Sequence, residues 1–160
     1  MLKKIIKILE NDARTDVKQI ATMVGSTAIQ VAGVINQAEE DRIIIKYKTM
    51  INWDKLGDER VWALIEVKMI PQRDVGFDSI AERIYRFSQA RTVYLVSGTY
   101  DLAVLVMADS MHEIADFVTQ KLAPIEGVQG TVTHFLLKRY KEDGEILEEK
   151  EGTKRQPLVL

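Results

Sequence analysis

The feature that most constrains this chain is a pair of helix starts on either side of a glycine. Asp16 stands three residues before Gln19, and Thr27 stands three residues before Gln30. Each pair fits the capping box, in which two side chains satisfy the free backbone groups of a first helical turn. Gly25 lies between the pairs, where a helix end favours a residue that tolerates a positive φ. The sequence therefore predicts two short helices joined by a tight turn.

Apolar residues repeat at helical spacing on both sides of this turn. They are Val17, Ile20, Ala21, Val24, Val31, Val34, Ile35 and Ala38. Two helices around a glycine-containing turn predict a helix-turn-helix, whose second helix can enter the major groove of DNA. A preceding helix over 2–10 and a β-branched strand, or wing, over 43–51 complete the predicted unit.

The composition excludes several kinds of site. The chain has 160 residues, of which 46% are hydrophobic, enough for one large domain or two small ones. It contains no cysteine, which excludes disulfides, thiolate nucleophiles and zinc–thiolate sites. Neither a signal peptide nor a run of roughly 20 apolar residues is found, so we expect a cytoplasmic protein without a membrane partner.

The net charge of −2 is distributed unevenly along the chain. Residues 1–50 carry eight Lys and Arg against six Asp and Glu. Residues 51–140 carry ten against twelve, and residues 141–160 carry four against six. Residues 1–50, which contain the predicted helix-turn-helix, are the only part with a positive net charge. A positive charge is the sign that nucleic-acid binding requires.

A different order of elements follows a turn-rich segment at 52–58. The expected strands are 61–69, 92–96, 102–108 and 128–139, and the expected helices are 77–85 and 110–122. The order β-α-β-β-α-β is that of a ferredoxin-like fold. The predicted class is α+β, with a winged helix-turn-helix over 1–50, a linker over 51–59, a ferredoxin-like domain of the dimeric α/β-barrel type over 60–140, and a charged tail over 141–160.

A sheet of this kind carries helices on one face only, and its other face remains rich in Val, Leu and Ile. A partner subunit is the simplest cover for such a face, so we expect a homo-oligomer, a dimer or higher. The tail from Lys141 mixes charged residues with Gly144 and Gly152 and predicts a solvated end. The alternative is that Leu158–Leu160 packs on a neighbouring subunit.

Several short motifs occur in a characteristic order through both predicted domains. In the first domain they are Ile8-Leu9, Ala13-Arg14, Ile20-Ala21, Gly25, Val31, Ile35, Glu39 and Ile43-Ile44. In the second they are Leu56-Gly57, Ser97–Leu102, Gly127-Val128, Thr131 and Thr133. Over about residues 5–140 this set resembles the Lrp/AsnC family of leucine- and asparagine-responsive transcription regulators. The resemblance implies a protein that binds double-stranded DNA and a small-molecule effector, an amino acid.

The predicted recognition helix departs from the family pattern. Family members usually carry Arg or Lys at the positions of Val34 and Gln37, whereas residues 26–40 contain no basic residue here. Arg42 also replaces the usual glycine before the wing. The candidate base contacts are Thr27, Gln30, Asn36 and Gln37, since amide side chains can pair with adenine. The candidate phosphate contacts are Arg14, Lys18, Arg42 and Lys46.

The segment between the second and third strands of the second domain is the candidate effector site. Backbone N–H groups of Gly98 and Thr99 can receive a carboxylate, and the Asp101 carboxylate can receive an ammonium group. The resemblance implies an effector site that contains Gly98, Thr99, Tyr100, Asp101, Thr131 and Thr133. The alternative is that Gly98 only makes the turn and Asp101 only caps it.

No residue pattern for catalysis, a cofactor or a metal ion is present. His112 is expected to be exposed on a helix, and His134 to be a hydrogen-bonded residue of a strand. Two alternatives stay open. A ligand-sensing partner subunit that does not bind DNA would explain the recognition helix without basic residues, and sirohaem decarboxylases resemble the same two-domain architecture. The prediction is a DNA-binding regulator and not an enzyme.

Overall fold

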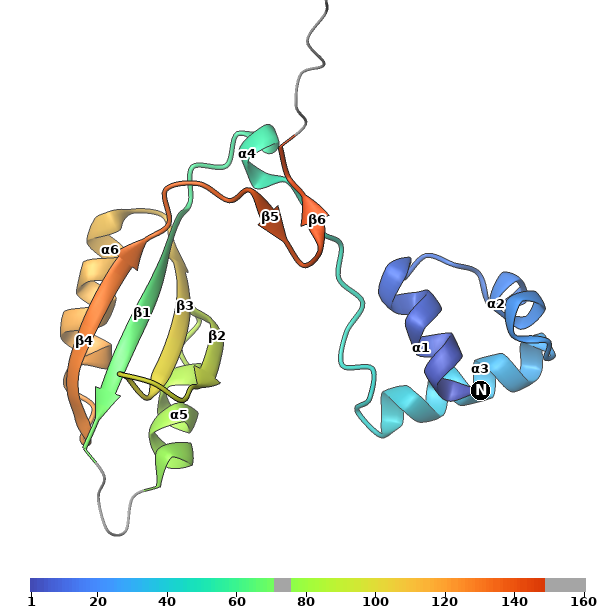
Figure 1. Cartoon of the computed structure of the whole chain (residues 1–160), viewed down its shortest axis with the longest axis horizontal. Coiled ribbons are helices and arrows are strands. Elements are labelled where there is room, and N and C mark those ends of the chain that lie inside the picture. The colour runs from blue at the N-terminus through green and yellow to red at the C-terminus, as the bar shows by residue number, and fades with distance from the viewer. Residues whose placement is uncertain (71–75, 149–160) are drawn as a thin grey trace, which may run out of the picture. The chain divides into compact units, whose positions relative to one another are not determined.

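The computed structural model describes residues 1–70 and 76–148, and the chain divides into two compact units. Unit 1 comprises Met1–Ile51, and unit 2 begins at Asn52. Unit 1 contains the helices α1 (Leu2–Asn11), α2 (Val17–Val24) and α3 (Ala28–Glu40), drawn from dark to light blue in Figure 1. Its three helices and the turn between α2 and α3 form the predicted helix-turn-helix.

The turn between α2 and α3 owes its shape to two local motifs. Gly25 ends α2 in the left-handed conformation with φ 69°, as the sequence predicts. Thr27 and Gln30 form the complete capping box at the start of α3. The second predicted box is wrong in part: Asp16 caps α2 by accepting a hydrogen bond from the Lys18 N–H. Among the bonds of the described residues, none returns from the Gln19 side chain.

A small apolar core holds the three helices of unit 1 together. Its buried members are Ile5, Ile20, Ala21, Val31 and Ile35, one or two from each helix. Burial of a side chain of this size stabilises a fold by about 1.5–3 kcal/mol relative to its exposure. The apolar repeat read from the sequence is therefore the packing surface of the helix-turn-helix.

The predicted wing strand over 43–51 is wrong. All of these residues are described, and none of them lies in a strand. Ile44 instead packs against the core of unit 1, and the Tyr47 hydroxyl donates a hydrogen bond of 2.8 Å to a Glu39 carboxylate oxygen. A β-branched sequence favours extended backbone, but a strand also requires a second strand to pair with its N–H and C=O groups.

Unit 2 contains a four-stranded antiparallel sheet in the order β2-β3-β1-β4. The strands are β1 (Val61–Met69), β2 (Ala90–Leu95), β3 (Leu102–Ala108) and β4 (Val128–Phe135). The helices are α4 (Trp53–Leu56), α5 (Phe77–Tyr85), α6 (Met111–Asp116) and the π-helical η1 (Phe117–Leu122), which continues α6. This order is the predicted β-α-β-β-α-β, which confirms the α+β class. Strand β4 ends four residues before its predicted limit.

One face of the sheet packs against the helices and forms the core of unit 2. Along β1, Ala63, Ile65 and Val67 are fully buried, and they lie opposite Val106, Val104 and Leu102 of β3. The helices contribute further buried residues, which are Ile80, Ile84, Ile114, Phe117 and Leu122. Figure 1 shows α6 behind the strands.

The residues that alternate with this core point to the other face of the sheet, here called the open face. Strand register assigns to it Trp62, Leu64, Glu66, Thr92, Tyr94, Ala103, Leu105, Met107, Val132 and His134. Most of these side chains are apolar or aromatic, and Tyr94 and Val132 are 63% and 52% exposed. His134 Nε2 lies 3.1 Å from a Glu66 carboxylate oxygen, so it is a paired strand residue, as predicted.

The first residues from Lys141 are mostly exposed, as expected for a solvated end, but they are not an irregular tail. They form a two-stranded hairpin of β5 (Lys141–Glu142) and β6 (Glu145–Ile146). The Asn52 side-chain amide donates a hydrogen bond of 2.8 Å to the Leu147 carbonyl and so joins the two ends of unit 2. The predicted alternative of packing by Leu158–Leu160 lies outside the described residues.

Candidate DNA-binding and effector sites

The outer face of α3 carries the candidate base contacts. Asn36 and Gln37 lie on it, and Gln30 lies at its N-terminal end; all three are exposed. Thr27 is the N-cap residue, with its hydroxyl oxygen bound by the Gln30 N–H. The sequence placed these residues on one polar face because their spacing is helical. Ile29 lies on the same face and was not among the predicted contacts.

The three amide side chains of α3 differ in their hydrogen-bond partners. The Gln30 Oε1 atom accepts from the Ser26 hydroxyl at 2.7 Å and from the Thr27 N–H at 3.4 Å, as part of the capping box. The Gln37 amide donates to Asp41 at 3.0 Å. Within the described parts of the chain, the Asn36 side chain has no such partner. A bidentate contact to adenine uses both atoms of the amide, so Asn36 can form one without breaking an internal bond.

The four candidate phosphate contacts are all exposed in unit 1. Arg14 lies in the turn before α2, Lys18 in the first turn of α2, and Arg42 and Lys46 after α3. None of the four forms an ion pair with any residue that the structure describes. Their charges are therefore free to neutralise phosphates, which supplies most of the affinity of a protein for DNA.

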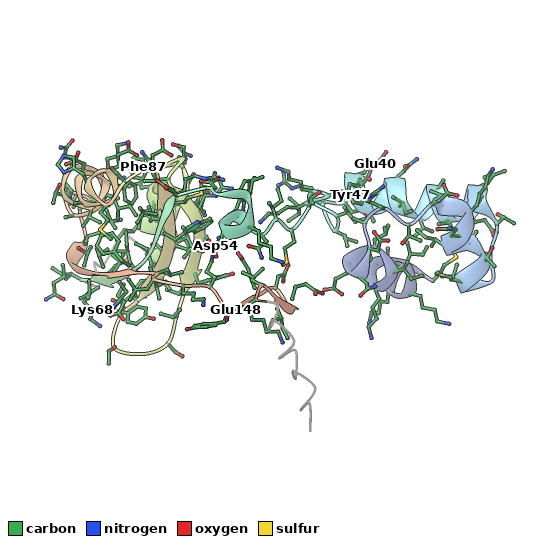
Figure 2. The ribbon with its side chains drawn as sticks, turned by 90° about the horizontal axis from the view of Figure 1, so that it is seen from above. Glu40, Tyr47, Asp54, Lys68, Phe87 and Glu148 are labelled. Carbon is green, nitrogen blue, oxygen red and sulfur yellow. The ribbon has the colours of Figure 1, made fainter. Side chains whose placement is uncertain are left out.

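Tyr47 fastens the segment after α3 to the end of that helix (Figure 2). Partial burial raises the pKa of Tyr47 above its usual 10.0, and the hydrogen bond to Glu39 raises it further. The phenol thus stays neutral and donates to Glu39 throughout the physiological pH range. This contact links the segment that contains Lys46 to the C-terminal end of α3.

The predicted effector segment between β2 and β3 is anchored to β1 by Asp101. The Asp101 N–H donates to the Val67 carbonyl at 3.0 Å, and its Oδ2 atom accepts from the Met69 N–H at 2.7 Å. Lys68 Nζ lies 3.6 Å from the same oxygen. The Asp101 side chain therefore bonds to the end of β1 and not to the turn itself, and its second carboxylate oxygen has no partner among the described residues.

Gly98 is not needed to make the turn. Its φ lies outside the left-handed region, and a Cβ atom built on it meets nothing within 4 Å. Gly98 and Thr99 are exposed, and Tyr100 is half-buried. A glycine that neither φ nor crowding requires leaves room for another group beside the backbone.

Thr131 and Thr133 lie on β4, opposite Val67 and Ile65 of β1. Directly opposed residues share a face of a sheet, so both threonines lie on the helix-covered side. On the side of β1 that faces β3, the Val67 carbonyl accepts the Asp101 N–H. Thr131 and the Ser97–Asp101 segment therefore lie at the same end of the sheet, with β1 between them. Thr133 lies two residues further along β4.

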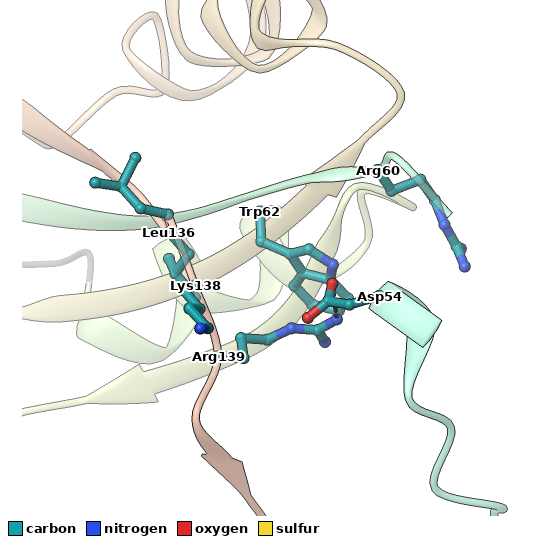
Figure 3. A pocket seen from close by; sticks show the side chains of 7 residues that line it. Asp54, Arg60, Trp62, Leu136, Lys138 and Arg139 are labelled. Atoms are coloured by element: carbon teal, nitrogen blue, oxygen red, sulfur yellow. Dashed lines mark ion pairs between the residues drawn. The ribbon is translucent and has the colours of Figure 1, made fainter. Parts of the chain in front are cut away.

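A pocket of about 330 Å³ that the sequence did not predict lies where β4 leaves the sheet. Arg139 lines this pocket: its guanidinium lies 5.3 Å from the centre of the Trp62 ring and pairs with Asp54 at 3.7 Å (Figure 3). The same guanidinium pairs with Glu142 at 3.1 Å. Arg60 pairs with Asp58 and stacks on Trp53 at 4.3 Å. That pairing lowers the pKa of Asp58 through its hydrogen bond to Arg60. Arg139 thus links α4 to the hairpin, and Arg60 contacts α4 and the turn that follows it.

Within the described ranges, no helix is long and apolar enough to cross a membrane. The same residues contain no group of three or more side chains suited to hold a metal ion.

Comparison with known proteins identifies the two units. The model of the Lrp/AsnC ligand binding domain matches residues 62–146, more than half of the chain. The HTH-type transcriptional regulator YugG of Bacillus subtilis is 45% identical over 153 residues, covering 95% of this chain and 92% of its own length. The HTH-type transcriptional regulator LrpA of Pyrococcus abyssi is 30% identical, covering 87% and 96%.

The fold of the whole chain also matches solved structures. A transcriptional regulator of Neisseria meningitidis, solved in complex with L-Met, superposes with a TM-score of 0.70 at 19% identity, over 88% of this chain and 90% of its own. The two relatives of this chain in Bacillus and Pyrococcus are named as transcriptional regulators and not as enzymes. This chain therefore belongs to the Lrp/AsnC family of HTH-type transcriptional regulators, which are DNA-binding proteins.

Proposed function

We propose that this protein is a cytoplasmic, sequence-specific transcription regulator whose DNA binding responds to an amino acid. The observation that carries the proposal is the outer face of α3 with its free Asn36 amide, beside four cations without internal partners. Asn36 would contact a base edge. Arg14, Lys18, Arg42 and Lys46 would bind phosphates, which fix register and orientation but carry no sequence information themselves.

The effector part of the proposal depends on the segment between β2 and β3. Exposed N–H groups at Gly98 and Thr99 would receive the carboxylate of a free amino acid, and the unpaired oxygen of Asp101 would receive its ammonium group. Tyr100 would lie beside the ligand, and Thr131, across β1 from this segment, would be nearer to it than Thr133. The Neisseria regulator solved with L-Met supports an amino acid as the class of ligand.

The response requires coupling between the effector and DNA. We propose that two or more copies assemble through the open face of the sheet, so that two helix-turn-helix units can read two half-sites related by a twofold axis. An effector would favour one geometry of this assembly over another. Its effect on operator affinity can be no larger than its difference in affinity for the two geometries.

Binding to DNA from upstream of the protein's own gene, compared with scrambled DNA at several salt concentrations, tests the regulatory function. We expect preferential binding that weakens as salt increases, because phosphate contacts release counterions. Selection from a random duplex library extends the test to operators elsewhere. If neither experiment yields a preferred duplex, the protein does not act alone as a regulator.

The absence of any preferred duplex would favour a partner subunit that senses a ligand without binding DNA. The specific observation in its support is that α3 carries no Lys or Arg. A mixture with a DNA-binding relative would then change the affinity of that relative for its operator.

Asp101→Asn tests the effector site. Asparagine can still accept the Met69 N–H, but it lacks the charge that would bind an ammonium group. Screening of the free amino acids by thermal unfolding should reveal the ligand, since a ligand at about a hundred times its Kd stabilises the folded state by about 2.7 kcal/mol. We expect Asp101→Asn to lose most of that stabilisation and to unfold normally without ligand. An undiminished shift would remove Asp101 from the site.

A further inference from the structure

Ile29 breaks the usual pattern of a soluble helix. It is the second residue of α3, and its side chain is 86% exposed. Among the large apolar side chains of the described residues, only Leu137 is more exposed. Nothing in unit 1 packs against Ile29, so its apolar surface does not contribute to the core.

Gly33 follows one turn later on the same outer face. A glycine weakens a helix interior relative to alanine. At Gly33 the φ lies outside the left-handed region, and a Cβ atom built there meets nothing within 4 Å. The fold of unit 1 therefore requires neither the conformational freedom of this glycine nor its small size. A residue that costs stability without a structural reason points to the close approach of something outside the unit.

The position of Ile29 near the start of α3, and the lack of Lys and Arg in that helix, indicate which bases this face would contact. The N-terminal residues of a recognition helix contact base edges in the major groove. The C5 methyl of thymine is an apolar group on those edges, and isoleucine is an apolar side chain of suitable reach. Guanine is usually contacted by Arg or Lys, which α3 lacks. Ile29 and Asn36 thus match thymine and adenine.

We propose that Ile29 is a specificity residue that contacts the C5 methyl of a thymine in each half-site, and that Gly33 allows α3 to approach the bases closely. This inference rests on the proposed DNA-binding function and adds two residues to it. It predicts half-sites that are read at A·T pairs.

Replacement of thymine by deoxyuridine tests the contact, because it removes only the methyl group. The probe is the tightest duplex selected by the full-length protein from a random library. We expect deoxyuridine at one thymine of each half-site to weaken binding about fourfold, the equivalent of one buried methyl group. The Ile29→Ala variant should bind the thymine duplex more weakly than the unchanged protein does. Its affinity should not change further when deoxyuridine replaces that thymine. Ile146→Ala, which changes a side chain that is 73% exposed in unit 2, is the matched control and should behave as the unchanged protein.

Gly33→Ala tests the close approach separately. It should raise the unfolding temperature, because alanine favours a helix, and weaken binding to the selected duplex at least about tenfold. Unchanged affinity would overturn the role of Gly33.

The remaining outcomes also decide the proposal. Wild-type binding that is indifferent to deoxyuridine at every thymine would overturn the methyl contact and leave the regulatory function intact. A smaller oligomer for Ile29→Ala in light scattering, with normal DNA binding, would overturn it by assigning Ile29 to contact with a second copy. Failure to select any duplex would overturn both this inference and the proposed function.

Discussion

Arg42 occupies a backbone conformation that L-residues with side chains rarely adopt, with φ 56°. The Arg42 N–H bonds to the Glu39 carbonyl, and the Ile43 N–H bonds to the Ala38 carbonyl at 2.8 Å. These two bonds define the Schellman motif, in which the left-handed position is usually glycine. An arginine there costs roughly 1–2 kcal/mol. Gly33 is the reverse case, a glycine where a larger residue would stabilise. Gly33 lies on the exposed face of α3 and Arg42 follows the end of that helix, and the proposed contacts with DNA would account for both deviations.

Arg42→Gly should therefore stabilise the protein and weaken its binding to DNA. The free energy of unfolding should rise by roughly 1 kcal/mol as the strain is relieved. Loss of a phosphate contact should weaken binding to specific and scrambled duplexes alike and reduce the salt slope by about 1 for each contact. Chemical denaturation and salt-titrated binding measure the two effects.

Asp143→Gly is the matched control for this prediction. Asp143 also has a positive φ, 48°, but lies in the hairpin of unit 2. It should change stability slightly and leave DNA binding unaltered. A salt slope for Arg42→Gly equal to that of the unchanged protein would contradict the phosphate contact.

Among the elements, α4 and the C-terminal hairpin form one structure from opposite ends of unit 2. The Asn52 side chain contacts both: its Oδ1 atom caps α4 by accepting from the Lys55 N–H at 3.2 Å, and its NH2 group donates to the Leu147 carbonyl. Arg139 adds its ion pairs with Asp54 and Glu142. The hairpin is too short to be stable by itself, because an isolated two-stranded hairpin is marginal in water. Its attachment to α4 is what holds it in place.

Asn52→Asp separates the two roles of this side chain. Aspartate keeps the cap of α4 but cannot donate to the Leu147 carbonyl. We expect the free energy of unfolding to fall by roughly 1 kcal/mol and the Leu147 amide to exchange its hydrogen faster. Amides of β1 and β3 should exchange at their original rates. Asn52→Ala, which loses both bonds, should be less stable than Asn52→Asp; equal hydrogen exchange in all three proteins would show that the hairpin does not depend on Asn52.

At the scale of the whole molecule, the open face of the sheet is left without a cover by the described residues of unit 2. Exposed aromatic and aliphatic side chains in a contiguous group mark an interaction surface. A twofold axis through such a face would bury it against a second copy, with the Glu66–His134 pair inside the contact. The proposed homo-oligomer follows from this face.

Val132→Glu tests that assembly. Val132 lies directly opposite Glu66 in the register, so a second carboxylate there would place like charges side by side within a buried contact. Light scattering should show a smaller species, with the far-UV circular dichroism of unit 2 preserved because the side chain lies outside its core. Met111→Glu, at a residue of α6 that is 55% exposed, should retain the original mass. An unchanged mass for Val132→Glu would exclude the open face as the main interface.

Much of this fold could be predicted from local sequence. The capping box of Thr27 and Gln30, the left-handed Gly25 and the alternation along β1 are each set by residues within a few positions of one another. The order of elements from β1 to β4 followed from the same local signals and was correct apart from strand ends, whereas α4 and the hairpin of β5 and β6 were not predicted. The segment 43–51 misled the prediction because β-branched residues report an extended preference, whereas a strand also needs a neighbour that the segment alone does not supply.

The candidate sites depended more on tertiary structure. Sequence alone determined the helix-turn-helix and the α+β domain, because helical and strand periodicity and capping act over short stretches of chain. The family followed from the resemblance of its ordered motifs. Only the tertiary structure decided that Asn36 is free of partners among the described residues while Gln30 and Gln37 are bonded, that Asp101 binds the Met69 backbone, and that Leu147 bonds to Asn52. Those facts depend on which atoms meet in space, and hydrogen bonds between residues as distant as Asn52 and Leu147 leave no periodic trace in the sequence.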